Sequence, residues 1–328
     1  MQLIETPEPH RFCVAPMLDW TTPECRALHR LFTRRAFLYT EMVTTGALIY
    51  GDAARHLQHQ ADAPCALQLG GGEPEALARA CEIALPYGYQ EINLNVGCPS
   101  DRVQNNRIGA CLMDDAPLVA ECLSAMQQAA GAVPVTVKHR LAIDEQDERD
   151  VLHFVETVAS RSPCRVFIIH ARKAWLQGLS PKANRDVPPL NYSLVYEVKR
   201  RFPALTVIIN GGITDLAQCR AHLQHVDGVM LGRAAYQNPE LLLAADTLYD
   251  DAAQTLNAVL PQIRALIAAR LARGEPLSHY TRHLLGLFPG VRGAKHYRRI
   301  LSEEARAPGA GIDIFDRALA AVATLEIA

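Results

Sequence analysis

The segment LTVIINGGITDLAQCRAHLQHVDGVMLGR, residues 205–233, contains two apolar runs that flank a stretch of helical character. The runs are 205–210 and 228–231, and the first is rich in β-branched residues, which favours a buried strand over a buried helix. Glycine follows directly after each run, at Gly211-Gly212 and at Gly232. Strand, helix and strand within roughly 30 residues has the size of one βα unit. This segment therefore indicates two parallel strands joined by a helix.

The same pattern covers most of the chain. Further apolar runs precede this segment at intervals of roughly 25–40 residues, at 12–17, 37–43, 66–69, 91–96, 134–138 and 165–170. Runs that are apolar throughout are typical of strands buried on both faces of a parallel sheet. Eight βα units in about 240 residues predict an α/β protein with a (β/α)8 TIM barrel. A doubly wound open sheet is the alternative, but Met17-Leu18-Asp19-Trp20 stands where its GxGxxG fingerprint is expected.

The chain of 328 residues is longer than one core usually supports, since single cores stop growing near roughly 250–300 residues. The strand-like runs stop after about Asp246, and a long apolar-periodic segment follows at 253–273. Further helical patterns begin at Tyr280, Gly293 and Asp313. We therefore expect a catalytic barrel domain over 1–245 and a small all-α helical domain over 246–328.

Composition excludes several classes of protein. Hydrophobic residues make up 49% and charged residues 21%, which argues against a disordered chain. The net charge of −2 argues against binding nucleic acid by being basic throughout. No stretch approaches the ~20 apolar residues of a membrane span, and residues 1–11 lack the features of a signal peptide. A cytoplasmic location without membrane contact is expected. Nine scattered cysteines without a CxxC pair predict neither a disulfide framework nor a metal site.

The active site of a barrel lies at the carboxyl ends of its strands. The glycines at Gly211-Gly212 and Gly232-Arg233 let backbone N–H groups approach an anion, and the arginine adds a charge, which favours phosphate binding. Lys138 ends the fifth run and has two interpretations, a Schiff-base nucleophile or a fixed cation beside an electron-rich cofactor. Cys98 lies on a loop after the fourth run. It is either a nucleophile that needs a partner such as His170, or a general acid in its thiol form.

Taken together, the ends of the runs resemble the flavin-dependent tRNA-dihydrouridine synthase family. The matching stretches, in family order, are Ala15-Pro16-Met17, Gln68-Leu69-Gly70, Asn95-Val96-Gly97-Cys98-Pro99-Ser100, Gly109-Ala110-Cys111-Leu112-Met113, Val137-Lys138-His139-Arg140, His170-Ala171-Arg172, Asn210-Gly211-Gly212-Ile213 and Gly232-Arg233. Three more stretches resemble its A-type subfamily, namely 17–21, 178–182 and 297–299. Asn106 and Ile108 depart from the family, which more often has Gly and Phe there.

This resemblance implies FMN as cofactor, NADPH as reductant, and reduction of the C5–C6 bond of uracil. Flavin N5 would deliver hydride to C6, and Cys98 would protonate C5. The A-type subfamily modifies uridines 20 and 20a in the tRNA D-loop. The residues that would bind FMN are Pro16, Met17, Leu18, Gln68, Lys138, His170, Asn210, Gly211, Gly212, Gly232 and Arg233.

A uridine inside folded tRNA must leave its stack to reach a barrel rim, so a second surface has to hold the RNA. Residues 276–302 carry basic side chains and no acidic one. Aromatic and histidine side chains interleave with them and are expected to stack or hydrogen-bond, namely Tyr280, His283, His296 and Tyr297. The predicted tRNA-binding residues are Asn95, Lys182, Arg185, Lys295, Arg298 and Arg299. A monomer is expected.

Three other functions stay open from the residues. The first is an FMN barrel oxidoreductase that acts on a small pyrimidine, which would have no need of the basic tail. The second is a cofactor-free lyase that uses Lys138. The third is a non-catalytic RNA-binding barrel, which the complete set of polar strand ends disfavours.

Overall fold

The computed structural model describes residues 9–100 and 107–323. Its centre is one parallel sheet of eight strands in the order β1-β8-β7-β6-β5-β4-β3-β2. A parallel bridge between Cys13 and Phe37 joins the two ends of this order, so the sheet closes into a barrel and the open-sheet alternative is wrong. The strands are β1 (Phe12–Val14), β2 (Leu38–Thr44), β3 (Cys65–Gly70), β4 (Glu91–Val96), β5 (Val135–Arg140), β6 (Val166–His170), β7 (Thr206–Asn210) and β8 (Gly228–Leu231).

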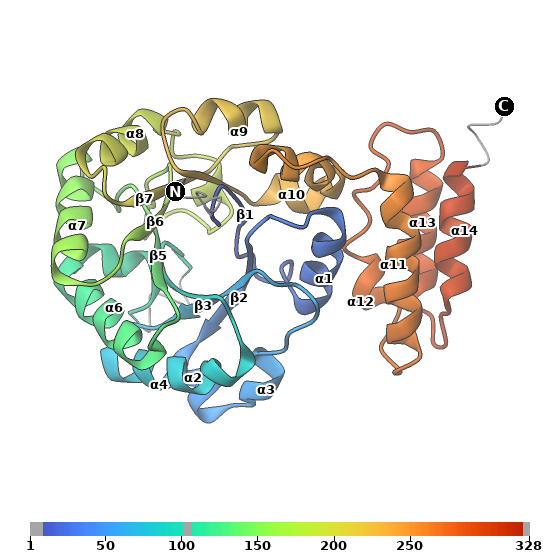
Figure 1. The fold of residues 1–328 in the computed structure, drawn as a ribbon, viewed down its shortest axis with the longest axis horizontal. Helices are drawn as coiled ribbons and strands as arrows, with labels where there is room; N and C mark the ends of the chain where they lie inside the picture. Colours follow the sequence, from blue (N-terminus) through green and yellow to red (C-terminus); the bar gives the residue numbers. More distant parts are fainter. Residues whose placement is uncertain (1–8, 101–106, 324–328) are drawn as a thin grey trace, which may run out of the picture.

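Helices alternate with the strands and surround them, as Figure 1 shows. The helices of the barrel are α1 (Pro23–Phe32), α2 (Thr45–Tyr50), α3 (Ala53–His56), α4 (Pro74–Ala84), α6 (Ala116–Ala130), α7 (Glu148–Arg161), α8 (Tyr192–Arg201), α9 (Leu216–His222) and α10 (Arg233–Gln237). Short 3-10 helices are η1 (Leu85–Tyr87), η2 (Gly109–Asp114), η3 (Ala183–Arg185), η4 (Pro239–Tyr249) and η5 (Glu304–Arg306). The predicted (β/α)8 barrel is confirmed.

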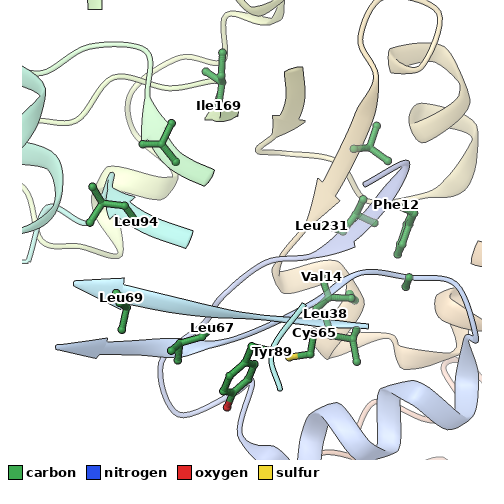
Figure 2. Packing of buried hydrophobic residues seen from close by; sticks show 14 of the residues in the cluster. Phe12, Val14, Leu38, Cys65, Leu67, Leu69, Tyr89, Leu94, Ile169 and Leu231 are labelled. Carbon is green, nitrogen blue, oxygen red and sulfur yellow. The ribbon is translucent and has the colours of Figure 1, made fainter. Parts of the chain in front are cut away.

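Side chains alternate along each strand between the barrel interior and the surrounding helices. The outward set packs against the helices and forms the main core, which includes Phe12, Val14, Leu67 and Leu69 (Figure 2). A smaller apolar cluster occupies the interior, namely Cys13, Ala15, Phe37, Tyr39, Ala66, Ile168, Ile208 and Met230. The rest of the interior is polar, and its carboxyl end forms the candidate site.

The first strand is shorter than the predicted 12–17, since β1 ends at Val14. Pro16 has no N–H for a strand ladder. The chain then turns, because the amides of Trp20 and Thr21 both donate to the carbonyl of Met17, at 3.1 and 2.9 Å. The prediction therefore extended a strand into a tight loop at the barrel rim.

The last part of the described chain is helical and stands beside the barrel, next to α1 and α10 (Figure 1). Its helices are α11 (Leu256–Leu271), α12 (Ser278–Thr281), α13 (Ala294–Glu303) and α14 (Ile312–Ala323). None of the described helices is long and apolar enough to cross a membrane.

The segment η4 lies between α10 and α11 in the chain. The carboxylate of Asp246 is fully buried and accepts hydrogen bonds from the Arg34 and Arg35 amides at 2.9 and 3.1 Å, so it anchors η4 to the loop after α1. The division into domains at residue 245 stays a prediction.

Candidate active site

The predicted site residues on β3 to β7 meet at one rim of the barrel. Strand register pairs Asn95 with Lys138, and His170 with Asn210, on neighbouring strands. The amide of Asn95 also donates to Gln68 Oε1 at 2.9 Å. Because the carboxyl ends of parallel strands lie at the same edge, these side chains form one continuous polar surface.

Cys98 lies at the start of the loop after β4, and Asn95 holds the backbone there. The amides of Gly97 and Cys98 both donate to Asn95 Oδ1 at 3.0 Å. The Cys98 carbonyl accepts from the amide of Ala110 at 2.9 Å, which ties the two ends of the loop together. Cys98 is partly exposed, in contrast to the buried cysteines of the core. This position lets its thiol meet a ligand at the rim.

The two departures from the family pattern lie near the end of this loop. Asn106 lies outside the described residues. Ile108 is buried, and its carbonyl accepts from the thiol of Cys111 at 3.3 Å. Burial raises the pKa of the Cys111 thiol. The Cys111 thiol therefore has a hydrogen-bond partner within the loop.

The rim is strongly cationic. Burial, reinforced by the charge of Arg140, lowers the pKa of Lys138 to about 8. Burial, reinforced by Arg140, Lys138, Arg172 and Arg233, holds the pKa of His170 well below its usual range, so its imidazole is neutral at pH 7. Of these cations, Arg233 pairs with Asp186, whereas Lys138, Arg140 and Arg172 take part in none of the ion pairs found among residues 9–100 and 107–323. This excess of positive charge favours an anionic ligand.

Arg140 belongs to the rim but is not among the site residues predicted from the sequence. Its side chain is 3% exposed, and its guanidinium donates to the carbonyls of Gly97, Lys173 and Asn184 at 3.0, 2.9 and 2.8 Å. It therefore links the Cys98 loop to the long loop after β6. The available signal was its spacing, since Arg140 follows Lys138 by two residues and so lies on the same face of β5.

The glycines after β7 are sterically required. Gly211 has φ +115° and Gly212 has φ +72°, conformations that favour glycine. A Cβ on Gly211 would lie 2.7 Å from the His170 ring, and a Cβ on Gly212 would lie 2.5 Å from Leu190. Both positions therefore require glycine, because neighbouring side chains already occupy the space that a Cβ would take. Nearby, Arg233 pairs with Asp186 at 2.8 Å, and both are substantially exposed.

The residues after β1 lie at the same rim. Pro16 and Met17 are partly buried, and the Met17 amide donates to Thr21 Oγ1 at 3.0 Å. Leu18 is 72% exposed and lines a cavity of about 470 Å³ together with Glu41 and Arg55. The cofactor-binding roles of these three residues stay predictions.

The predicted RNA-binding cations are exposed in two places. Lys182 and Arg185 flank the buried Asn184 in the loop after β6, while the other three lie on one face of α13, namely Lys295, Arg298 and Arg299. None of the five takes part in the ion pairs recorded for residues 9–100 and 107–323. Their charges are therefore available to a partner.

The expected stacking role of the aromatic side chains in 276–302 is wrong for most of them. Tyr280 and Tyr297 are fully buried, and His283 is 2% exposed. The Tyr297 hydroxyl donates to the Leu284 carbonyl at 3.1 Å, so it joins α13 to the turn after α12. Tyr297 lies on the apolar face of α13 with Ala294, Ile300 and Leu301, which are also buried. His296 alone of the four is exposed.

Fold and site together define a (β/α)8-barrel enzyme with a thiol at a cationic rim. Residues 13–322 match the family model described as Dihydrouridine synthase (Dus). The chain therefore belongs to the dihydrouridine synthase family.

Curated relatives agree over nearly the whole length. The tRNA-dihydrouridine(20/20a) synthase of Yersinia pestis is 56% identical over 316 residues, covering 95% of this chain and 91% of the relative. The protein of the same name from Escherichia coli strain K12 is 53% identical over 317 residues, covering 95% and 92%. Among solved structures, morphinone reductase in complex with tetrahydroNAD aligns with a TM-score of 0.50 at 13% identity, covering 76% of this chain and 90% of that chain. This last likeness concerns the fold alone.

Proposed function

We propose that the protein reduces the C5–C6 double bond of uridines 20 and 20a in the tRNA D-loop to give dihydrouridine. The observation that carries this proposal is the partly exposed Cys98 at a cationic rim with Asn95 and Lys138, in a chain of the dihydrouridine synthase family. The proposal includes FMN as cofactor, NADPH as reductant, a cytoplasmic location and a monomer.

The residues at the rim fit FMN. Gly211 and Gly212 carry no side chain that would cover the N–H groups of the loop after β7, and Arg233 at the start of α10 supplies a positive charge for a phosphate. Asn210 donates to the Met230 carbonyl at 2.7 Å and holds β7 and β8 together below this loop, and Gly232 directly precedes α10. The ring would lie against Gln68, Lys138 and His170. When bound, FMN supplies the two-electron chemistry, a hydride for C6 of uracil.

Lys138 and Cys98 have different tasks in this scheme. The Lys138 ammonium places a fixed positive charge beside the electron-rich ring. The Cys98 thiol donates its proton to C5, the S–H bond breaks as the C5–H bond forms, and the thiolate regains a proton from solvent. Asn95 already orients the Cys98 amide, and its position next to Lys138 lets it face the base as well.

The exposed cations of the loop after β6 and of α13 would bind phosphates of the tRNA. Five unpaired charges give affinity without base recognition, and they position the RNA so that the target uridine can be turned out of its stack. An oxidoreductase that acts on a free pyrimidine would gain nothing from them.

Mass mapping of dihydrouridine in tRNA tests the proposal. Cells that lack the gene should lose dihydrouridine at positions 20 and 20a, and a plasmid with the intact gene should restore it. A plasmid with Cys98→Ala is the matched control and should not. Unchanged dihydrouridine at both positions, or purified protein that reduces free uracil but not tRNA, would overturn the proposal.

A further inference from the structure

A chain of hydrogen bonds runs through the barrel interior beneath the candidate site. Thr136 Oγ1 donates to Glu91 Oε1 at 2.7 Å, and Asn93 Nδ2 donates to Thr136 Oγ1 at 2.8 Å. Gln68 Nε2 donates to Asn93 Oδ1 at 2.8 Å, and Asn95 Nδ2 donates to Gln68 Oε1 at 2.9 Å. The first four of these residues are at most 1% exposed, so water does not compete for the bonds.

The upper end of the chain fixes its direction. Asn95 Oδ1 accepts from the backbone amides of Gly97 and Cys98, and an amide N–H can only donate. The other end of the Asn95 side chain must therefore be its NH2 group, which can only donate to Gln68. Gln68 accepts through its oxygen, so its NH2 group must face Asn93, and Asn93 must in turn accept through its oxygen and donate to Thr136. Each of these two side-chain amides therefore has one orientation.

The lower end imposes the same direction independently. A carboxylate accepts and does not donate. Glu91 accepts from Thr136 and from the Tyr39 hydroxyl, the latter at 2.8 Å, and its second oxygen faces His10 Nε2 at 2.5 Å. Thr136 therefore turns its hydrogen down toward Glu91 and its lone pair up toward Asn93. Both ends agree, so every donor points from the Cys98 loop toward Glu91.

We infer that Glu91 and Thr136 are positioning residues that act on the reaction through this chain, an inference that rests on the proposed function. The oxygen and nitrogen of a side-chain amide have nearly the same size, so packing alone does not distinguish the two orientations. Without the Thr136 hydroxyl, the buried NH2 group of Asn93 would lose its acceptor. The Asn93 side chain would then have to move to find another partner, and Gln68, which donates to Asn93, would no longer be held in place at the rim. Because amides in the chain exchange no protons, it transmits orientation and not a proton.

Thr136→Val tests this inference, because valine keeps the shape of threonine and removes both the donor and the acceptor. Two controls are matched to it. Thr136→Ser retains the hydroxyl, and Tyr39→Phe removes a different buried hydroxyl from the same carboxylate. The measurements are the flavin midpoint potential and absorption spectrum of the holoenzyme, and kcat and KM for tRNA.

Thr136→Val should bind FMN, shift the flavin potential and lower kcat by roughly tenfold or more, with an unchanged KM for tRNA. Thr136→Ser and Tyr39→Phe should keep the wild-type potential. A merely structural threonine would lower the melting temperature and leave the potential unchanged. If Thr136→Val does not fold, Thr136→Ala removes the same hydroxyl and leaves more room.

A wild-type potential and kcat in Thr136→Val, or failure of Thr136→Ser to restore them, would overturn the inference. Wild-type protein that binds no flavin, or forms no dihydrouridine in tRNA, would instead overturn the proposed function. The two failures are thus separate.

Discussion

Cys98 is the residue whose replacement separates the two halves of the proposed reaction. Cys98→Ala removes the proton donor and leaves the rim cations and glycines in place, so FMN binding and its reduction by NADPH should be unchanged. Dihydrouridine formation should fall by roughly 10²–10⁴-fold, the usual contribution of general acid catalysis. Stopped-flow absorbance of the flavin, during reduction by NADPH and then during oxidation by tRNA, measures the two halves. Cys111→Ala is the control, and wild-type oxidation by tRNA in Cys98→Ala would remove Cys98 as the donor.

Lys138 destabilises the folded apoprotein at neutral pH, because the fold lowers the pKa of its amine. In the unfolded chain this amine has an ordinary pKa near 10.4, whereas in the folded apoprotein its pKa is about 8. The unfolded state therefore binds more protons between these values, and stability rises with pH through this window. Below pH 8 the charged amine destabilises the fold, by roughly 3 kcal/mol at most.

Lys138→Met should therefore stabilise the apoprotein near pH 7 and abolish uridine reduction. Its advantage in the free energy of unfolding should shrink as the pH rises from 8 to 10, because the wild-type amine then becomes neutral. Urea unfolding of both proteins at pH 7 and pH 10 measures this. An advantage that is constant or grows with pH would contradict the assigned pKa shift.

At the scale of elements, α13 presents the clearest surface for RNA. Lys295, Arg298 and Arg299 lie on its exposed face, while Tyr297 and Ile300 lie on the buried face. Arg298→Glu with Arg299→Glu should therefore leave the fold intact and weaken tRNA binding. The logarithm of the binding constant falls linearly with the logarithm of the salt concentration. Each lost phosphate contact should make this slope shallower by somewhat less than one.

The control for this pair is Arg201→Glu, an exposed cation at the end of α8 on the barrel wall. Filter binding of tRNA at several salt concentrations, with circular dichroism to check the fold, gives the comparison. Equal affinity for the α13 variant and the wild type would exclude α13 as a binding surface.

The apolar runs predicted the strands well. A strand that is buried on both faces is apolar along its whole length, and this is visible in the local sequence. The bounds of β4 and β8 agree with the sequence prediction to the residue. The start of α1 also has a local signal, since Thr22 caps this helix and Pro23 is its first residue. The error at β1 came from Pro16 and Met17, which continue the apolar run but belong to a turn.

The site was only partly predictable, for a physical reason. Strand ends are local, so Lys138 and His170 could be placed at the rim from the sequence. The contact between Thr136 and Glu91 depends on the register of two strands, which a single sequence does not state. Burial of Tyr280 and Tyr297 was missed because a helix of mixed composition shows which side chains are charged, but not how deeply its aromatic rings pack.

At the scale of the whole molecule, the helical region and the active-site rim are joined by polar contacts. Arg282 donates to the Asp19 carbonyl at 2.8 Å, in the loop that follows β1. His283 lies between Thr22 and Tyr236, with ring nitrogens 3.2 and 3.1 Å from their hydroxyls. The proposed RNA-binding surface on the helical region is thus fixed relative to the rim where the base would have to arrive.

FMN should stabilise the folded protein, because the proposed FMN site exists only in the folded barrel and not in the unfolded chain. At a free concentration of 100 times its Kd, the gain in the free energy of unfolding is about 2.7 kcal/mol. Scanning calorimetry of protein stripped of flavin and then reloaded measures the change in Tm. Riboflavin has the same ring but lacks the phosphate that we assign to Gly211, Gly212 and Arg233, so it should raise Tm less at equal concentration. Equal shifts from the two ligands would show that the loops after β7 and β8 do not hold the phosphate, whereas no shift from either would place the flavin site itself in error.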